Sequence, residues 1–150
     1  MTNTDFDALL QIHDRPGEWE QPFSFVRDIA ERRFRALVPA LEQLLSGPLQ
    51  FEDGVYIQDA SFHAQAFVPQ AALRRALGPS ECCVVRFSNF GDMVAVRPED
   101  ALQPAVLAKL CEALTAAGYL YVPQAALDHP YTGGGVNGIW TWWDRYFDWL

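Results

Sequence analysis

The last thirteen residues of the chain, Gly138 to Leu150, form an ending that is rich in aromatic side chains. Six of the thirteen are aromatic, and they include four of the protein's five tryptophans. Because one large ring can bury roughly 150–250 Å², this segment carries too much apolar surface to be left in water. It must fill the core of the domain, form a surface for a partner, or do both with different faces.

The local pattern of this ending predicts how it folds. Thr141 and Asp144 have the spacing of a capping box, which begins a helix by satisfying free backbone N–H groups. We therefore expect a short strand or loop through Trp140, followed by a helical turn over residues 142–149. If the segment serves a partner, the residues expected to bind it are Trp140, Trp142, Trp143, Arg145, Tyr146 and Trp149.

The length and composition of the chain indicate a globular domain. The chain has 150 residues, of which half are hydrophobic, so it can bury a sizeable core. It contains no run of the roughly 18 apolar residues that a membrane span requires. Its acidic start lacks the basic and apolar regions of a signal peptide. We expect a single domain over residues 1–150, located in the cytoplasm, with a flexible glycine-rich loop at residues 132–138.

Hydrophobic periodicity indicates an α+β fold. Apolar steps of three and four residues predict helices, here over residues 4–13, 25–46, 69–77 and 101–117. Ser24 and Thr4 are the expected N-caps, and Pro39 should kink or split the second helix. Alternating apolar residues predict strands, here over residues 49–52, 54–58, 61–68, 81–88, 93–97 and 119–122. The expected architecture is a mainly antiparallel sheet of five or six strands, packed against the two longer helices.

The charge of the chain restricts its partners. Nineteen acidic residues against eleven basic ones give a net charge of −8. Nucleic acid is disfavoured, because binding phosphates needs a basic face, and an anionic membrane surface is disfavoured for the same reason. A basic protein is the partner whose approach this field would accelerate.

Cofactor and metal motifs are absent from the sequence. The histidines, His13, His63 and His129, show no ligand spacing. The glycine-rich stretch at 132–138 lacks the lysine of a phosphate-binding loop. An odd number of cysteines argues against a disulfide framework, and their apolar contexts indicate small buried side chains. We predict neither a cofactor nor a metal.

One group of side chains gives an enzymatic alternative. Asp53, Asp59, His63 and Asp92 fall in or beside the predicted strands and turns, where they could line one rim of a sheet. Carboxylates in unequal environments perform acid–base chemistry, so a small hydrolase or ligand-binding domain could use this rim. Turns also collect aspartate for reasons of backbone hydrogen bonding alone, and the protein is more simply explained as a non-enzyme.

The size, the acidity, the lack of active-site signatures and the ending Thr-Trp-Trp-Asp-Arg-Tyr-Phe-Asp-Trp-Leu together resemble the small acidic α+β proteins of bacterial toxin–immunity systems. The resemblance implies a protein that binds one cognate toxin and blocks its active site, with acidic side chains facing a basic cleft. It assigns no role to an individual residue. The expected function is protein binding, as an immunity protein or inhibitor; a self-associating subunit that dimerises through the aromatic ending is a further alternative.

Overall fold

The computed structural model describes residues 2–57, 59–134 and 138–149. They form one five-stranded sheet in the order β1-β2-β3-β4-β5. The strands are β1 (Gln50–Asp53), β2 (Phe62–Phe67), β3 (Val84–Ser88), β4 (Met93–Arg97) and β5 (Leu120–Tyr121). The helices are α1 (Asn3–Ile12), α2 (Arg27–Leu44), α3 (Pro104–Ala116), α4 (Gln124–Leu127) and α5 (Trp142–Phe147).

The strands pair mainly antiparallel. β1 pairs with β2, β2 with β3, and β3 with β4 in antiparallel register. The last strand, β5, runs parallel to β4 because the intervening helix α3 carries the chain back to the same end of the sheet. The predicted α+β fold, with a mainly antiparallel sheet and two longer helices, is confirmed.

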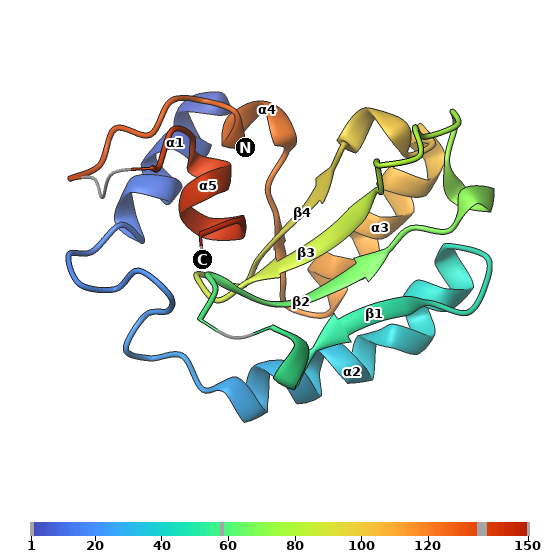
Figure 1. Ribbon diagram of the computed structural model, residues 1–150, viewed down its shortest axis with the longest axis horizontal. Helices are drawn as coiled ribbons and strands as arrows, with labels where there is room; N and C mark the ends of the chain where they lie inside the picture. The colour runs from blue at the N-terminus through green and yellow to red at the C-terminus, as the bar shows by residue number, and fades with distance from the viewer. Residues whose placement is uncertain (1, 58, 135–137, 150) are drawn as a thin grey trace.

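Successive residues of β4 face opposite sides of the sheet, as the pleat requires. Val94 and Val96 belong to a core cluster with residues of α2 and α3, whereas Met93 and Ala95 belong to a cluster with residues of α1, α4 and α5. Figure 1 shows α1, α4 and α5 gathered at one end of the molecule, apart from α2 and α3. The sheet therefore separates two apolar cores.

The aromatic ending builds much of the second core. Trp142, Trp143, Tyr146 and Phe147 are buried, and the rings of Trp142 and Tyr146 stack with centroids 5.7 Å apart. Thr141 caps α5, and its hydroxyl and the Asp144 carboxylate form the predicted capping box. The predicted helical turn at this end of the chain is confirmed, and these four rings fill the protein's own interior.

Several predicted elements were wrong in extent. Residues 54–56 form a short 3-10 turn rather than a strand, so β1 pairs with β2 without the expected tight hairpin. The predicted helix 69–77 is a 3-10 turn over residues 70–72. In both segments a few apolar residues were over-interpreted, because short periodic runs do not distinguish turns from regular elements.

The helix starts also differ from the prediction. Thr2, not Thr4, caps α1, and its partner in the capping box is Asp5. Helix α2 follows Val26 with no side-chain cap, so Ser24 does not serve that purpose. Pro39 lies inside α2 without splitting it into two elements. Of the predicted glycine-rich loop, residues 135–137 lie outside the described part of the chain.

Among the described residues, no helix combines the length and apolarity that crossing a membrane would require.

Candidate functional site

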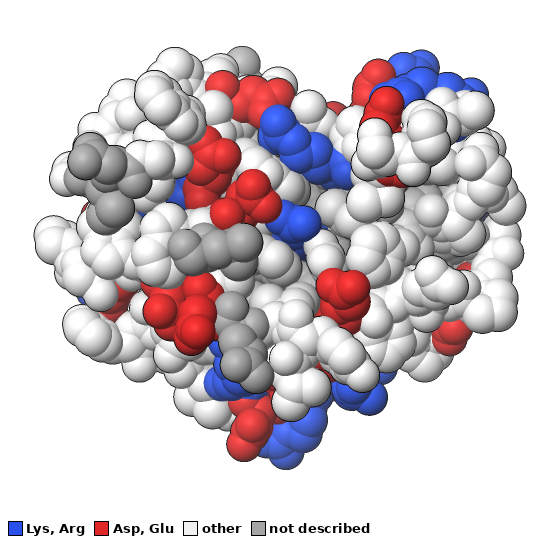
Figure 2. All heavy atoms as spheres, in the orientation of Figure 1, with Lys and Arg blue, Asp and Glu red and all other residues white. Residues whose placement is uncertain are grey.

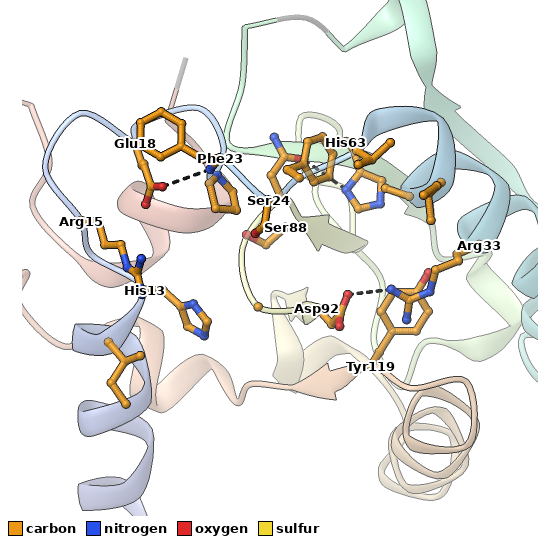
Figure 3. A pocket seen from close by; sticks show the side chains of 18 residues that line it. His13, Arg15, Glu18, Phe23, Ser24, Arg33, His63, Ser88, Asp92 and Tyr119 are labelled. Carbon is orange, nitrogen blue, oxygen red and sulfur yellow. Dashed lines mark hydrogen bonds and ion pairs between the residues drawn. The ribbon is translucent and has the colours of Figure 1, made fainter.

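A cavity of about 620 Å³ lies where the two halves of the fold meet. Its walls come from the end of α1, the segment 22–26 and the first turns of α2. Its floor comes from β2 and from the turn between β3 and β4 (Figure 3). This volume falls within the roughly 300–1,000 Å³ of small-molecule sites, so the cavity is the candidate site of the protein.

His63 is the most constrained polar residue of this cavity. The residue is 3% exposed, and its Nδ1 lies 3.1 Å from Oδ1 of Asn89. The amide nitrogen of Asn89 donates to the carbonyls of Glu20 and Ala60, each at 2.9 Å, which fixes Oδ1 as the atom facing the imidazole. Nδ1 of His63 must therefore carry the proton, and Nε2 presents a lone pair.

The electrostatic surroundings keep His63 uncharged. Burial lowers its pKa from 6.5 to about 4, and this effect outweighs the opposing effect of the hydrogen bond that His63 donates to Asn89. Nearby Arg27 and Arg33 lower the pKa further. At neutral pH the side chain is thus a neutral hydrogen-bond acceptor. Its Nε2 is shielded from water and has no hydrogen-bond partner among the described residues.

Tyr119 supplies a second polar group to the cavity. Its hydroxyl is also shielded from water and also has no hydrogen-bond partner in the described part of the chain. Burial raises its pKa, so the hydroxyl stays protonated and available as a donor. The guanidinium carbon of Arg33 lies 4.5 Å from the centre of the Tyr119 ring, and Arg33 pairs with Asp92 at 2.7 Å (Figure 3).

The rim of the cavity is apolar and exposed. Ile12, Phe23, Val26 and Ile29 all line it, although their side chains reach into solvent. Phe23 is 90% exposed, and its backbone N–H is held by the buried carboxylate of Glu18 at 3.0 Å. The rim therefore presents large apolar side chains on a fixed backbone.

A second, smaller hollow also adjoins the start of α2. It is lined by Glu20, Arg27, Glu31, Val55 and Asp59, among others. Arg27 and Glu31 lie one turn apart on α2, 3.7 Å from each other. The lining of this hollow combines acidic side chains with the exposed Val55. The next residue in the chain, Tyr56, is 79% exposed. The start of α2 is thus flanked by two hollows.

The predicted catalytic residues do not form one constellation. Asp53 is buried in a two-pronged ion pair with Arg35, at 2.8 and 2.9 Å, and lines neither hollow. Asp59 lines the smaller hollow. Only His63 and Asp92 line the same cavity, and there Asp92 is engaged by Arg33. The strand predicted at 54–58 had suggested a shared rim, and its absence separates the aspartates.

The predicted partner-binding residues are divided between interior and surface. Trp142, Trp143, Arg145 and Tyr146 are buried within the chain itself. Trp149 is half-buried, and its backbone N–H donates a hydrogen bond to the Ser61 hydroxyl at 3.2 Å. Trp140 is 79% exposed. Trp140 is therefore the member of this group that offers a large open surface to a partner.

Reactive and ligating groups are sparse. No cluster of three His, Cys, Asp or Glu side chains that could hold a metal ion occurs among the described residues. Cys83 is buried, and burial raises its pKa to about 12, so it remains a thiol. Cys82 is exposed, contrary to the expectation that all three cysteines are buried.

Most residues of the site are not predicted from the sequence. Phe23, Arg33 and Tyr119 carried no signal of their own, because they fall in a loop, a helix and a strand start whose partners are distant in the chain. The sequence Pro22-Phe23-Ser24, a large ring between a proline and a polar residue just before a helix, was the available hint.

Comparison of the chain with family models, with curated proteins and with solved structures gives no significant match. The function therefore has to be argued from the site itself.

Proposed function

We propose that this protein is a protein-binding domain whose docking face surrounds the start of α2. The observation that carries the proposal is the concentration of exposed large apolar side chains at this place. Seven such side chains are found among the described residues; five of them line one of the two hollows, and a sixth, Tyr56, lies in the chain between two residues that do. These six define the docking face: Ile12, Phe23, Val26, Ile29, Val55 and Tyr56. An exposed apolar patch with a polar surround is typical of a protein-binding site.

Aromatic anchors support this role. Binding energy in protein interfaces is concentrated in a few large side chains that enter hollows or cover them. Phe23 and Tyr56, at 90% and 79% exposure, are the largest candidates on the docking face. The hydrogen bond from Phe23 N–H to Glu18, and that from Phe25 N–H to the Pro22 carbonyl at 3.0 Å, hold the segment in place. A fixed anchor loses little conformational entropy on binding.

Charge favours a basic partner. The net charge is −8, and Glu20, Glu31 and Asp59 line the smaller hollow beside the single cation Arg27. On the face seen in Figure 2, acidic side chains lie over the half of the molecule that carries α1 and α5, whereas basic and acidic side chains lie together at the lower edge, where α2 begins. Acidic groups around an apolar patch accelerate and orient the approach of a basic protein. The most concrete form of the proposal is an immunity protein or inhibitor of such a partner.

The hydrolase alternative receives less support. His63 and Asp92 share a cavity, but an imidazole with a pKa near 4 is a weak base at neutral pH. The self-association alternative through the aromatic ending is also less favoured, because four of its six residues already pack inside the chain. Neither alternative explains why exposed apolar side chains collect around α2.

The test compares three versions of the tagged protein as baits in extracts of its own host. They are the unmodified chain, a docking-face variant with Phe23→Ser and Ile29→Ser, and the control Trp140→Ser. All three substituted residues are exposed, so the fold should survive in each variant. We expect a basic protein that is retained by the unmodified chain and by the Trp140 variant, lost with the docking-face variant, and weakened by salt.

Retention by the docking-face variant together with loss in the Trp140 variant would overturn the proposal and transfer the interface to the aromatic ending. Circular dichroism of each bait, before use, separates a lost interface from a lost fold.

A further inference from the structure

The floor of the large cavity carries two buried polar atoms whose hydrogen-bonding capacity is unused. Nε2 of His63 and the hydroxyl of Tyr119 are both shielded from water, and neither has a partner among the described residues. Both side chains line the cavity. Buried polar groups are nearly always hydrogen-bonded, because leaving them without a partner costs free energy. Two such groups at one cavity point to a ligand.

The other polar groups of the floor are already engaged. The Ser88 hydroxyl donates to the carbonyl of Tyr146 at 2.8 Å and accepts from the N–H of Phe90 at 3.2 Å. The side chain of Asn89 makes three hydrogen bonds, to His63, Glu20 and Ala60. Of the polar groups on the floor, His63 and Tyr119 therefore remain for a ligand, and the walls add His13, Arg15 and Ser24.

The hydrogen-bonding character of these two atoms selects the ligand chemistry. Nε2 of His63 accepts, because Nδ1 carries the proton, and the Tyr119 hydroxyl is a donor that can also accept. A carboxylate or phosphate offers only acceptors and would face the lone pair of Nε2. A cation would meet Arg33 and Arg15, which also line the cavity. A neutral hydroxyl group both donates and accepts, so it suits both atoms.

The cavity walls select the rest of the ligand. Ile12, Phe25, Val26 and Ile29 surround the space with apolar surface, and the centres of the Phe25 and His63 rings are 5.6 Å apart. An apolar body packed against these side chains would leave its polar end at the floor. We propose that the cavity binds a small neutral molecule with a hydroxyl group on an apolar, ring-sized body, held by His63 and Tyr119.

Arg33 lines the cavity next to Tyr119. Its guanidinium covers one face of the Tyr119 ring and pairs with Asp92, yet the Arg33 side chain is 37% exposed. Because the pair is solvent-exposed, it constrains Arg33 weakly. Because the hydroxyl is shielded in this arrangement, the inference requires Arg33 to rotate away from Tyr119 when the ligand binds. This inference goes beyond the proposed protein-binding function and does not depend on it.

The test uses the purified protein and three matched probes: phenol, toluene and benzoate. Phenol and toluene have nearly the same shape but differ in the hydroxyl, and benzoate adds a negative charge. We expect phenol to bind roughly tenfold more tightly than toluene, as two net hydrogen bonds would give, and benzoate to bind more weakly than phenol. Titration calorimetry measures the three affinities without any protein partner, so failure here leaves the protein-binding proposal unaffected.

Two tyrosine variants assign the contact. Tyr119→Phe removes the hydroxyl that lacks a partner, so we expect it to fold normally, to lower phenol affinity roughly fivefold and to leave toluene affinity unchanged. Tyr56→Phe removes a hydroxyl that does not line the cavity and should change neither affinity. In long-range ¹H–¹⁵N spectra, phenol but not toluene should shift the Nε2 resonance of His63.

Three results would overturn the inference: equal affinities for phenol and toluene, tighter binding of benzoate, or no binding of any probe at millimolar concentration. Equal effects of the Tyr119 and Tyr56 variants on phenol would also contradict it, because the hydroxyl contact would then lie elsewhere.

Discussion

Arg145 and Asp14, which are 131 residues apart in the sequence, form a buried ion pair in which the arginine Nε lies 2.8 Å from a carboxylate oxygen. The same guanidinium donates to the backbone carbonyls of Glu18 at 2.6 Å and Trp19 at 3.2 Å. The side chain of Glu18 in turn accepts from Phe23 N–H. The aromatic ending therefore positions the segment that carries the principal anchor of the docking face.

Replacing Arg145 by leucine should destabilise the fold strongly. Arg145 is fully buried, and its loss would remove the charged partner of Asp14, which would keep only the Tyr131 hydroxyl as a donor, and would leave two carbonyls without the Arg145 donor. We expect a loss of about 3–5 kcal/mol in the free energy of unfolding, measured in urea. The control Arg75→Leu breaks two exposed ion pairs and should cost less than about 1 kcal/mol. Similar losses in the two variants would show that the buried Arg145 pair contributes no more to stability than an exposed ion pair does.

Removing residues 142–150 should prevent folding. The truncation takes away four buried rings and Arg145, which together make up most of one side of the second core. We expect the cooperative thermal transition and the near-ultraviolet circular dichroism to disappear. Trp140→Ala changes an exposed ring of the same segment and should shift the free energy of unfolding by no more than about 0.5 kcal/mol. A truncated chain that kept its melting temperature would contradict the role of the ending as core.

Gly91 should resist substitution because of His13. The residue has φ +58, and a Cβ placed there would lie 2.5 Å from Nε2 of the His13 ring. We expect Gly91→Ala to destabilise the protein by about 1–2 kcal/mol through backbone strain alone, and by more through the clash. Adding His13→Ala should restore only the stability that is lost through the clash, and the loss through backbone strain should remain. Strictly additive effects in this double-mutant cycle would mean that the two residues do not meet.

Lowering the pH should weaken the fold through His63. Burial lowers the pKa of His63 from 6.5 to about 4, so the unfolded chain takes up this proton at higher pH than the folded chain does. The stability that comes from keeping His63 neutral is therefore fully present above pH 6.5 and is lost as the pH falls toward 4. The difference between the pKa values of His63 in the unfolded and the folded protein corresponds to about 3 kcal/mol of stability at most.

His63→Gln lacks this titration, and its amide can still donate to Asn89. Urea unfolding of both proteins between pH 7 and 4 separates the contribution of His63 from that of the carboxylates, which are common to both. We expect the difference in stability between the unmodified protein and the His63→Gln variant to shrink as the pH falls from 7 to 4. A constant difference would show that His63 has the same pKa in the folded and the unfolded protein.

The sequence predicted the features that rest on local chemistry. The capping box of Thr141 and Asp144 and the strand over residues 93–97 both depend on residues a few positions apart. The division of β4 into two faces follows from strict alternation. These interactions form between neighbours in the chain, so periodicity and turn chemistry reveal them.

The site could not be predicted in this way because it depends on distant pairings. The meeting of His63 with Asn89, of Arg33 with Tyr119 and of Arg145 with Asp14 requires knowing how the sheet and the second core assemble. The separation of the predicted aspartates likewise depends on a turn at 54–56 that was expected to be a strand. Sequence patterns carry little information on such contacts.

The most direct test of the docking face is site-specific photo-crosslinking in the native host. A benzophenone-bearing amino acid replaces Phe23 in one version, Tyr56 in a second and Trp140 in a third; all three positions are exposed in the structure. The account predicts a crosslinked product of one discrete mass, containing the same basic partner, from positions 23 and 56 and none from position 140. Crosslinking from position 140 alone, or only to a second copy of this chain, would contradict it.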